Sequence, residues 1–271
     1  MRVKDRRLAR DQKLPRAGPQ AFENHYWQLF GARWPELRRA LLLPARQVAL
    51  RDGLLQPYYL DEASVAAADA LPLTAGDRIV DFCAAPGGKS LALARRLPPG
   101  ATLICNERSS ARRARLHRVL DSHLAPQLRR RVSVSGHDAT RWGLIQPSSC
   151  QRILLDVPCS SERHVITDAT HLGRWSASRP RRLSIQAFAL LASAIDALEG
   201  GGSLLYVTCA LTPAENDQVI ARALRKRAGQ VEYQTPELPW GESTEYGIHV
   251  LPDAAEGRGP LYVCLLHKIL P

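Results

Sequence analysis

The 271-residue sequence predicts an α/β fold with a doubly wound, mostly parallel sheet and a small helical extension on its N-terminal side. Short apolar runs alternate with helix-like segments from about residue 76 onward, which is the pattern of βαβ units. Most of these runs are continuously apolar, as in parallel strands that are covered on both faces. The chain is 45% hydrophobic and has no internal repeat, so it can bury one sizeable core.

The first 70 residues are expected to lie outside this sheet. Residues 1–20 predict a basic flexible arm, because proline and glycine interrupt it. Residues 21–70 predict a helical extension, since the aromatic and leucine spacing of 21–42 is typical of one or two amphipathic helices. After Pro57 we expect a turn and then a further helix with an acidic start.

Strands and helices alternate along the main domain, residues 71–271. The strands are expected at 77–85, 101–107, 131–139, 151–159, 203–211 and 259–270. The helices are expected at 88–97, 109–124, 181–201 and 213–228. A long basic loop is expected between Cys159 and the third of these helices.

Composition restricts the partners and the location. The net charge of +11 favours a polyanionic partner, although it does not distinguish RNA from DNA, or either from a merely basic protein. No apolar run is long enough to cross a membrane, and the basic start lacks the apolar segment of a secretory signal. Asp5 and Asp11 weaken the case for a transit peptide. We expect a monomeric cytoplasmic protein, or a mitochondrial one if the source is eukaryotic.

The six cysteines predict neither a metal site nor a disulfide framework. None forms a C-x-x-C pair, none has a histidine at zinc-ligand spacing, and no secretion signal is present. Each thiol is therefore expected to be reduced, and to be either core filling or part of a reaction. They are Cys83, Cys105, Cys150, Cys159, Cys209 and Cys264.

A cofactor site is expected beyond the first strand, where the sequence reads DFCAAPGGKS. Glycines there let the backbone approach a ligand, although a plain tight turn would read the same. The pattern is neither G-x-G-x-x-G nor a phosphate loop, which disfavours NAD and ATP. Glu107 and Asp138 end the next two strands, where they could accept from ribose hydroxyls and an adenine amino group or simply cap helices. Together they favour an adenosyl cofactor, and S-adenosylmethionine qualifies.

Two cysteines follow neighbouring strands. Asp156 and Cys159 close the fourth strand and Cys209 closes the fifth, so both thiols are expected at one crevice. Carbon 5 of a pyrimidine becomes nucleophilic once a thiolate adds to carbon 6, and a nearby acid favours that addition. Spacing alone leaves open whether these are two buried core cysteines, and which of them would attack.

These segments resemble the Nop/Sun family of RNA cytosine-5 methyltransferases. The likeness covers about residues 55–268 and rests on DFCAAPGGKS, LLDVPCSSERH, and LLYVTCAL followed by ENDQV. It implies a Rossmann-like, class I methyltransferase domain over 71–271 with a seven-stranded sheet. S-adenosylmethionine is then the cofactor and RNA the partner.

The resemblance also implies a role for each site residue. Cys209 would attack carbon 6, Cys159 would assist release, and Asp156 would contact the cytosine edge and the methionine end of the cofactor. Glu107 would hold the ribose and Asp138 the adenine. The remaining cofactor-lining residues would be Cys83, Ala84, Ala85, Pro86, Gly87, Gly88 and Lys89.

The chain departs from the family pattern around the first cysteine. It has Val157 and then Ser161–His164 where glycine is usual, a variant that resembles the compact branch with mitochondrial ribosomal-RNA and tRNA enzymes. We expect small-subunit (16S) ribosomal RNA, free or in a ribosomal subunit or assembly particle, ahead of tRNA. A non-catalytic RNA-binding assembly factor is the rival from another class, which the two strand-end thiols disfavour.

Basic and aromatic residues of 164–184 are candidates for RNA contact, because guanidinium and aromatic planes stack on unpaired bases. A solvated basic loop with one packed tryptophan would give the same sequence. The candidates are His164, Arg174, Trp175, Arg179, Arg181 and Arg182.

Overall fold

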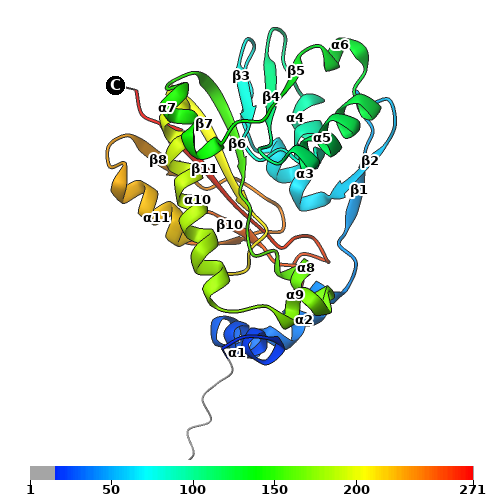
Figure 1. Ribbon diagram of the computed structural model, residues 1–271, viewed down its shortest axis with the longest axis vertical. Coiled ribbons are helices and arrows are strands. Elements are labelled where there is room, and N and C mark those ends of the chain that lie inside the picture. The colour runs from blue at the N-terminus through cyan, green and yellow to red at the C-terminus, as the bar shows by residue number, and fades with distance from the viewer. Residues whose placement is uncertain (1–15, 271) are drawn as a thin grey trace, which may run out of the picture.

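The computed structural model describes residues 16–270, and its centre is a nine-stranded sheet with the order β5-β4-β3-β6-β7-β11-β10-β9 (Figure 1). β8 pairs with β11 beside this path. The first five strands of this order, β5, β4, β3, β6 and β7, are mutually parallel. β11 runs antiparallel to β7. The strands are β3 (Arg78–Asp81), β4 (Thr102–Asn106), β5 (Val132–Ser135), β6 (Cys150–Asp156), β7 (Leu198–Thr208), β8 (Val231–Gln234), β9 (Glu242–Ser243), β10 (Ile248–Val250) and β11 (Leu261–Lys268).

Helices cover both faces of this sheet, which confirms the doubly wound, mostly parallel α/β fold. The helices are α1 (Pro19–Phe30), α2 (Trp34–Leu42), α3 (Glu62–Asp69), α4 (Gly88–Ala94), α5 (Ser110–His123), α6 (Pro126–Arg129), α7 (Trp142–Ile145), α8 (Glu162–Thr167), α9 (Ala169–Gly173), α10 (Ser178–Ala197) and α11 (Asp217–Lys226), with short 3-10 turns at η1 (Gly31–Arg33) and η2 (Ala139–Arg141). The strand count is nine rather than seven, because β8, β9 and β10, each of two to four residues, are too short to be predicted from the sequence.

The core lies in two layers, one on each side of the sheet. Side chains of a strand alternate between faces, so Leu154 packs toward α3 and α4 while Ile153 and Leu155 pack toward α7 and α10. Both neighbours of β6 are parallel strands, and every second residue of β6 meets a different apolar layer. This explains the uninterrupted apolar run of β6 in the sequence.

The N-terminal extension contains a β-hairpin as well as helices, which corrects the expectation of an all-helical segment. β1 (Gln47–Leu50) pairs antiparallel with β2 (Tyr58–Asp61), where a turn was expected. Most of the expected basic arm lies outside the described residues. Within 16–20, Ala17 bridges to Ser176 and α1 begins at Pro19, so the arm does not extend to residue 20.

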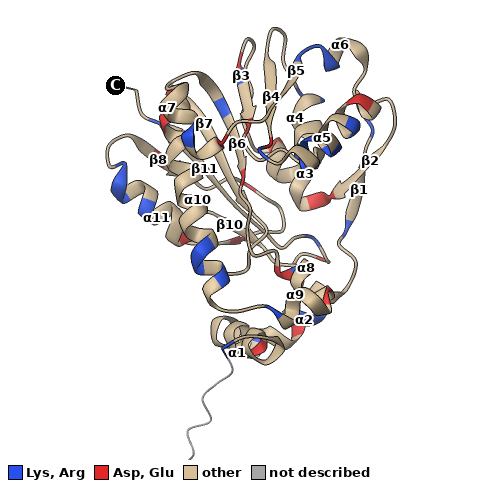
Figure 2. Ribbon diagram, in the orientation of Figure 1, with Lys and Arg blue, Asp and Glu red and all other residues tan. Residues whose placement is uncertain are grey.

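The segment after Cys159 is helical rather than a long loop. α8, α9 and the first turn of α10 occupy it, and α10 begins at Ser178, earlier than expected. These helices gather with α1 and α2 at one end of the molecule (Figure 1). Within residues 16–270, none of the helices is long and apolar enough to cross a membrane. Lys and Arg lie on α5, α11 and the first turns of α10 (Figure 2).

Candidate active site

Two thiols meet where β6 and β7 end. Cys159 follows β6 and Cys209 follows β7, and these strands are parallel neighbours with Asp156 paired to Val207. Their Sγ atoms lie 3.1 Å apart, and the Cys209 N–H donates to the Cys159 Sγ at 3.3 Å. Both cysteines are free thiols. Parallel pairing therefore brings together two cysteines that are 50 positions apart in the sequence.

The environment gives the two thiols different proton affinities. Hydrogen bonding from Cys159, together with that from the Ser161 hydroxyl 3.2 Å away, lowers the pKa of Cys209. The same contact with Cys209 raises the pKa of Cys159, and burial adds to that rise. Cys209 is therefore the more easily ionised thiol of the pair, and the thiolate is the form of a cysteine that acts as a nucleophile.

An ion pair lies beside the thiols. Lys89 Nζ, on the first turn of α4, donates to Asp156 Oδ2 at 2.8 Å. Burial acts to lower the pKa of Lys89, but the attraction of Asp156 outweighs it and the pKa is raised. Lys89 thus remains an ammonium group in a nearly buried position, 13% exposed.

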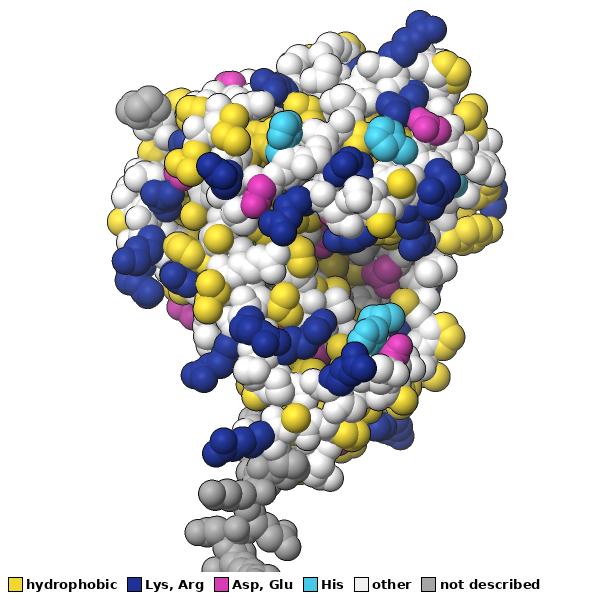
Figure 3. Space-filling model, in the orientation of Figure 1, with side chains coloured by type: hydrophobic (Ala, Val, Ile, Leu, Met, Phe, Trp, Pro, Cys, Tyr) yellow, Lys and Arg dark blue, Asp and Glu magenta, His cyan; other side chains and the backbone are white. Residues whose placement is uncertain are grey.

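Cys209, Lys89 and Asp156 line a cavity of about 650 Å³, which we call the reaction cavity. Its walls come from the sheet, the N-terminal extension, α8 and the segment before β11. Figure 3 shows a hollow between α3 and α8, with an acidic side chain inside and basic and histidine side chains around it. The residues that line it include Leu43, Asp61, Lys89, Asp156, Ser161, Arg163, His164 and Cys209.

A second cavity, of about 340 Å³, lies across the Pro158 segment and is called the cofactor cavity below. Cys83, Glu107 and Asp138 all line it, as the sequence predicted for an adenosyl site. Glu107 is almost fully buried, and its Oε2 lies 3.1 Å from Arg112 Nη1, although the two do not form a well-aligned hydrogen bond. A carboxylate oxygen can accept more than one hydrogen bond, so Glu107 can still accept from ribose hydroxyls and the cavity fits an adenosyl group.

Asp138 is less well explained by a ligand alone. Hydrogen bonds from Thr140 lower its pKa, and its Oδ2 also accepts from Arg108 at 3.2 Å. It therefore caps the turn η2 as well as facing the cofactor cavity. The structure thus shows Asp138 as a cap, and its contact with adenine stays a prediction.

The loop 83–89 connects the two cavities, because Cys83 lines one and Lys89 the other. Gly87 has φ +118°, a conformation that side chains rarely tolerate. A Cβ on Gly88 would lie 2.9 Å from Leu60 Cδ1, so this glycine lets the loop pack on the hairpin. Pro86 is exposed, while Ala84 and Ala85 are buried.

A buried carboxyl network beneath the thiols escaped the sequence analysis. The hydroxyl of Ser160 contacts both Glu162, at 2.5 Å, and Glu215. Glu162 also accepts from Tyr26 of α1 at 2.5 Å and from the N–H of Leu211 at 3.1 Å. Since one hydroxyl proton cannot serve two carboxylates, one carboxyl must be protonated. Burial raises the pKa of both carboxyls, that of Glu215 to about 8, which favours this shared proton.

The expected RNA contacts divide into two groups. Trp175 is 1% exposed and packs against Phe22 and Tyr26, so the prediction that it stacks on RNA is wrong, and the packed-tryptophan alternative holds. Burial of this large ring anchors α1. The four arginines lie at the surface or partly exposed on α9 and α10, and exposed His164 lines the reaction cavity: Arg174, Arg179, Arg181, Arg182 and His164.

Solved structures share this fold. A methyltransferase homolog protein from Pyrococcus horikoshii aligns with a TM-score of 0.71 at 20% identity, over 93% of this chain and 95% of that one. NSun6 from Pyrococcus horikoshii, solved with SFG, aligns with a TM-score of 0.68 at 21% identity, over 81% of this chain and 54% of that one.

Curated relatives are more similar in sequence. A Danio rerio protein named tRNA (cytosine(34)-C(5))-methyltransferase, mitochondrial, is 36% identical over 230 residues, which is 80% of this chain and 62% of the relative. A Mus musculus 5-cytosine rRNA methyltransferase, NSUN4, is 33% identical over 245 residues, 83% of this chain and 63% of the relative. The chain thus spans a little over six-tenths of each.

A family model assigns the chain. The family described as 16S rRNA methyltransferase RsmB/F matches residues 68–267, nearly all of the main domain and most of the chain. This match confirms the resemblance to the Nop/Sun family that the motifs indicated. The chain belongs to the RsmB/F family of methyltransferases.

Proposed function

We propose that this protein transfers a methyl group from S-adenosylmethionine to carbon 5 of a cytosine in RNA. One juxtaposition supports this most strongly: Cys209, whose Sγ contacts that of Cys159, lines the same cavity as the Lys89–Asp156 ion pair. The names of the curated relatives and of the family agree with this chemistry.

The residues of the cofactor cavity would hold S-adenosylmethionine. Glu107 accepts from the ribose hydroxyls, Asp138 from the adenine amino group, and Cys83 lies against the adenosyl group. The loop from Ala84 to Gly88 supplies the backbone that faces the methionine end. Bound there, the cofactor supplies an electrophilic methyl group.

The residues of the reaction cavity would activate the base. The Cys209 thiolate bonds to carbon 6, and the electron pair displaced in the ring makes carbon 5 nucleophilic. Asp156 accepts from the cytosine amino group, and the Lys89 ammonium stabilises negative charge on that edge. Once carbon 5 carries its methyl group, a solvent base takes the carbon-5 proton, the C5–H electron pair forms the C5=C6 double bond, the C6–S bond breaks, and Cys209 leaves as a thiolate. Cys159 assists this release.

Small-subunit ribosomal RNA is the substrate that we favour, free or in a ribosomal particle. The family description names 16S rRNA, and one relative is named for rRNA while another is named for tRNA, so tRNA is the alternative. The name of the Danio rerio relative fits a mitochondrial as well as a cytoplasmic location.

Labelled-methyl transfer from S-adenosylmethionine tests the proposal. The acceptors are hypomethylated small-subunit particles, free small-subunit RNA and tRNA, and the Cys209→Ala protein is the control. We expect label in 5-methylcytosine of the ribosomal RNA and none with the variant. Label in tRNA alone would make tRNA, rather than ribosomal RNA, the substrate. Unchanged transfer by Cys209→Ala would refute the mechanism.

A further inference from the structure

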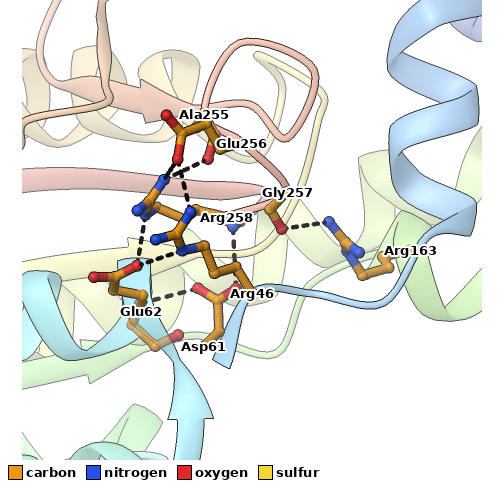
Figure 4. Close-up of polar contacts among 10 residues, drawn as sticks. Arg46, Asp61, Glu62, Arg163, Ala255, Glu256, Gly257 and Arg258 are labelled. Atoms are coloured by element: carbon orange, nitrogen blue, oxygen red, sulfur yellow. Dashed lines mark hydrogen bonds and ion pairs between the residues drawn. The ribbon is translucent and has the colours of Figure 1, made fainter. Parts of the chain in front are cut away.

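One arginine of the reaction cavity has no carboxylate partner. Arg163 of α8 donates from Nη1 to the Leu43 carbonyl at 2.6 Å and from Nη2 to the Gly257 carbonyl at 3.2 Å (Figure 4). Within residues 16–270, no carboxylate lies at ion-pair distance from it. Burial lowers its pKa, as expected for a half-buried cation without a counter-ion.

The neighbouring arginines provide a contrast. Arg46 pairs with Glu62 at 3.2 Å and with Glu256 at 2.7 Å, and Arg258 pairs with the same two carboxylates at 2.7 and 3.0 Å. Figure 4 shows these two arginines and two glutamates as a closed cluster, across from Arg163. Two positive and two negative charges cancel there, whereas Arg163 is left uncompensated.

Asp61 is the nearest acidic group that acts on Arg163, but it is already engaged. Its Oδ1 accepts from the Ser64 N–H at 3.2 Å and its Oδ2 from the Gly259 N–H at 3.1 Å. Its charge raises the pKa of Arg163 less than burial lowers it. Asp61 therefore shapes the cavity wall and leaves room for an anion at Arg163.

The position of Arg163 indicates which anion it binds. Its neighbours His164 and Leu43 are exposed, Leu43 by 63%, so Arg163 lies at the rim of the cavity that Cys209 lines. A target base must leave its stack to reach a thiol in such a cavity, and its backbone then crosses the rim. The unused N–H groups of a guanidinium match phosphate oxygens.

We propose that Arg163 binds the phosphate adjoining the target cytidine and thereby positions the flipped nucleotide. This inference rests on the proposed function, since it requires an RNA strand that enters the reaction cavity. About 650 Å³ is within the range of roughly 300–1,000 Å³ of cavities that hold drug-sized ligands, so a base with its ribose and phosphate can be accommodated.

Binding of a short single-stranded RNA with one central cytidine, measured from about 50 to 200 mM salt, tests the charge. We expect Arg163→Gln to weaken binding about tenfold and to reduce the slope of log affinity against log salt by about 0.7, the value for one phosphate contact on a single strand. Arg163→Lys should keep the slope, because it keeps the charge. Arg46→Gln is the matched control and should bind as the wild-type protein does, since Arg46 is already neutralised.

Replacing single phosphates by neutral methylphosphonates locates the contact. One substitution beside the cytidine should weaken binding to the wild-type protein but cause no further loss with Arg163→Gln. Equal losses with both proteins would overturn the inference, as would an Arg46→Gln effect as large as that of Arg163→Gln. If the wild-type protein makes 5-methylcytosine and Arg163→Gln binds RNA with the same affinity and salt dependence as the wild type, only this inference fails. If the wild-type protein methylates no RNA, the proposed function fails first.

Discussion

At the scale of single residues, the chemistry depends on where one proton resides. The sulfurs of Cys159 and Cys209 are 3.1 Å apart, and hydrogen bonding lowers the pKa of Cys209 while raising that of Cys159. Ser161 adds a hydroxyl near Cys209 at 3.2 Å. The two thiols, for which we propose the roles of attack and release, are thus distinguished by their partners rather than by their exposure.

This difference predicts opposite outcomes for two alanine variants. Cys159→Ala should accumulate a covalent protein–RNA adduct, because Cys209 still attacks while release is slow. The measurement is a slow-migrating, RNase-sensitive band in a denaturing gel after incubation with RNA and S-adenosylmethionine. Cys209→Ala should give no band, and a band with that variant instead would reverse the two assignments.

At the scale of elements, the buried carboxyl network connects α1 to both cysteine loops. Glu162 of α8 accepts from Tyr26 of α1 and from the Leu211 N–H, two residues after Cys209. Ser160, next to Cys159, joins Glu162 to Glu215. The network therefore holds the two loops in register. It also keeps one carboxyl protonated, whereas a carboxyl exposed to water at neutral pH would be ionised.

The network predicts that stability falls as pH rises. The pKa of Glu215 is about 8 in the folded protein and near its ordinary 4.5 in the unfolded chain. Between these values the unfolded chain releases a proton that the folded protein keeps, so this group favours unfolding increasingly, by at most about 1.4 kcal/mol per pH unit. Glu215→Gln should reduce the decline in urea midpoint between pH 6 and pH 8. Equal declines in both proteins would contradict this account.

At the scale of the whole molecule, the N-terminal extension completes a cavity that the sheet alone leaves open. The reaction cavity includes Leu43 from the end of α2, whereas the cofactor cavity is built from the main domain alone. Trp175 fixes the extension, with its ring centroid 5.3 Å from that of Phe22. The proposed cofactor binding and the proposed RNA chemistry therefore depend on different parts of the chain.

Trp175→Ala should separate these two functions. Removing a buried tryptophan costs about 3–5 kcal/mol, here where the segment between α9 and α10 packs against α1. We expect faster hydrogen exchange in α1 and α2 and a large loss of methyl transfer, with binding of S-adenosylmethionine retained. Trp175→Phe is the matched control and should be milder, because it keeps most of the buried ring. Unchanged exchange in α1 and α2 would show that another contact anchors the extension.

The sequence alone determined the parallel sheet, the strand-end positions of Asp156, Cys159 and Cys209, and the family. Apolar runs and motif spacing are local properties of the sequence. Parallel pairing places the carboxyl ends of neighbouring strands side by side, whichever side chains the strands carry. It missed the hairpin of residues 47–61 and placed Trp175 on the surface. The error at Trp175 depends on which distant segment covers that residue, which no local pattern records.

Only the tertiary structure decided the roles of Glu162 and Arg163. Both lie in SSERH, a stretch that reads as polar surface, yet one is fully buried against Tyr26 and the other is half-buried without a counter-charge. The partners of Glu162 and Arg163 lie 136 and 120 positions away in the sequence. Burial and charge compensation depend on such distant partners, so they are fixed when the chain folds.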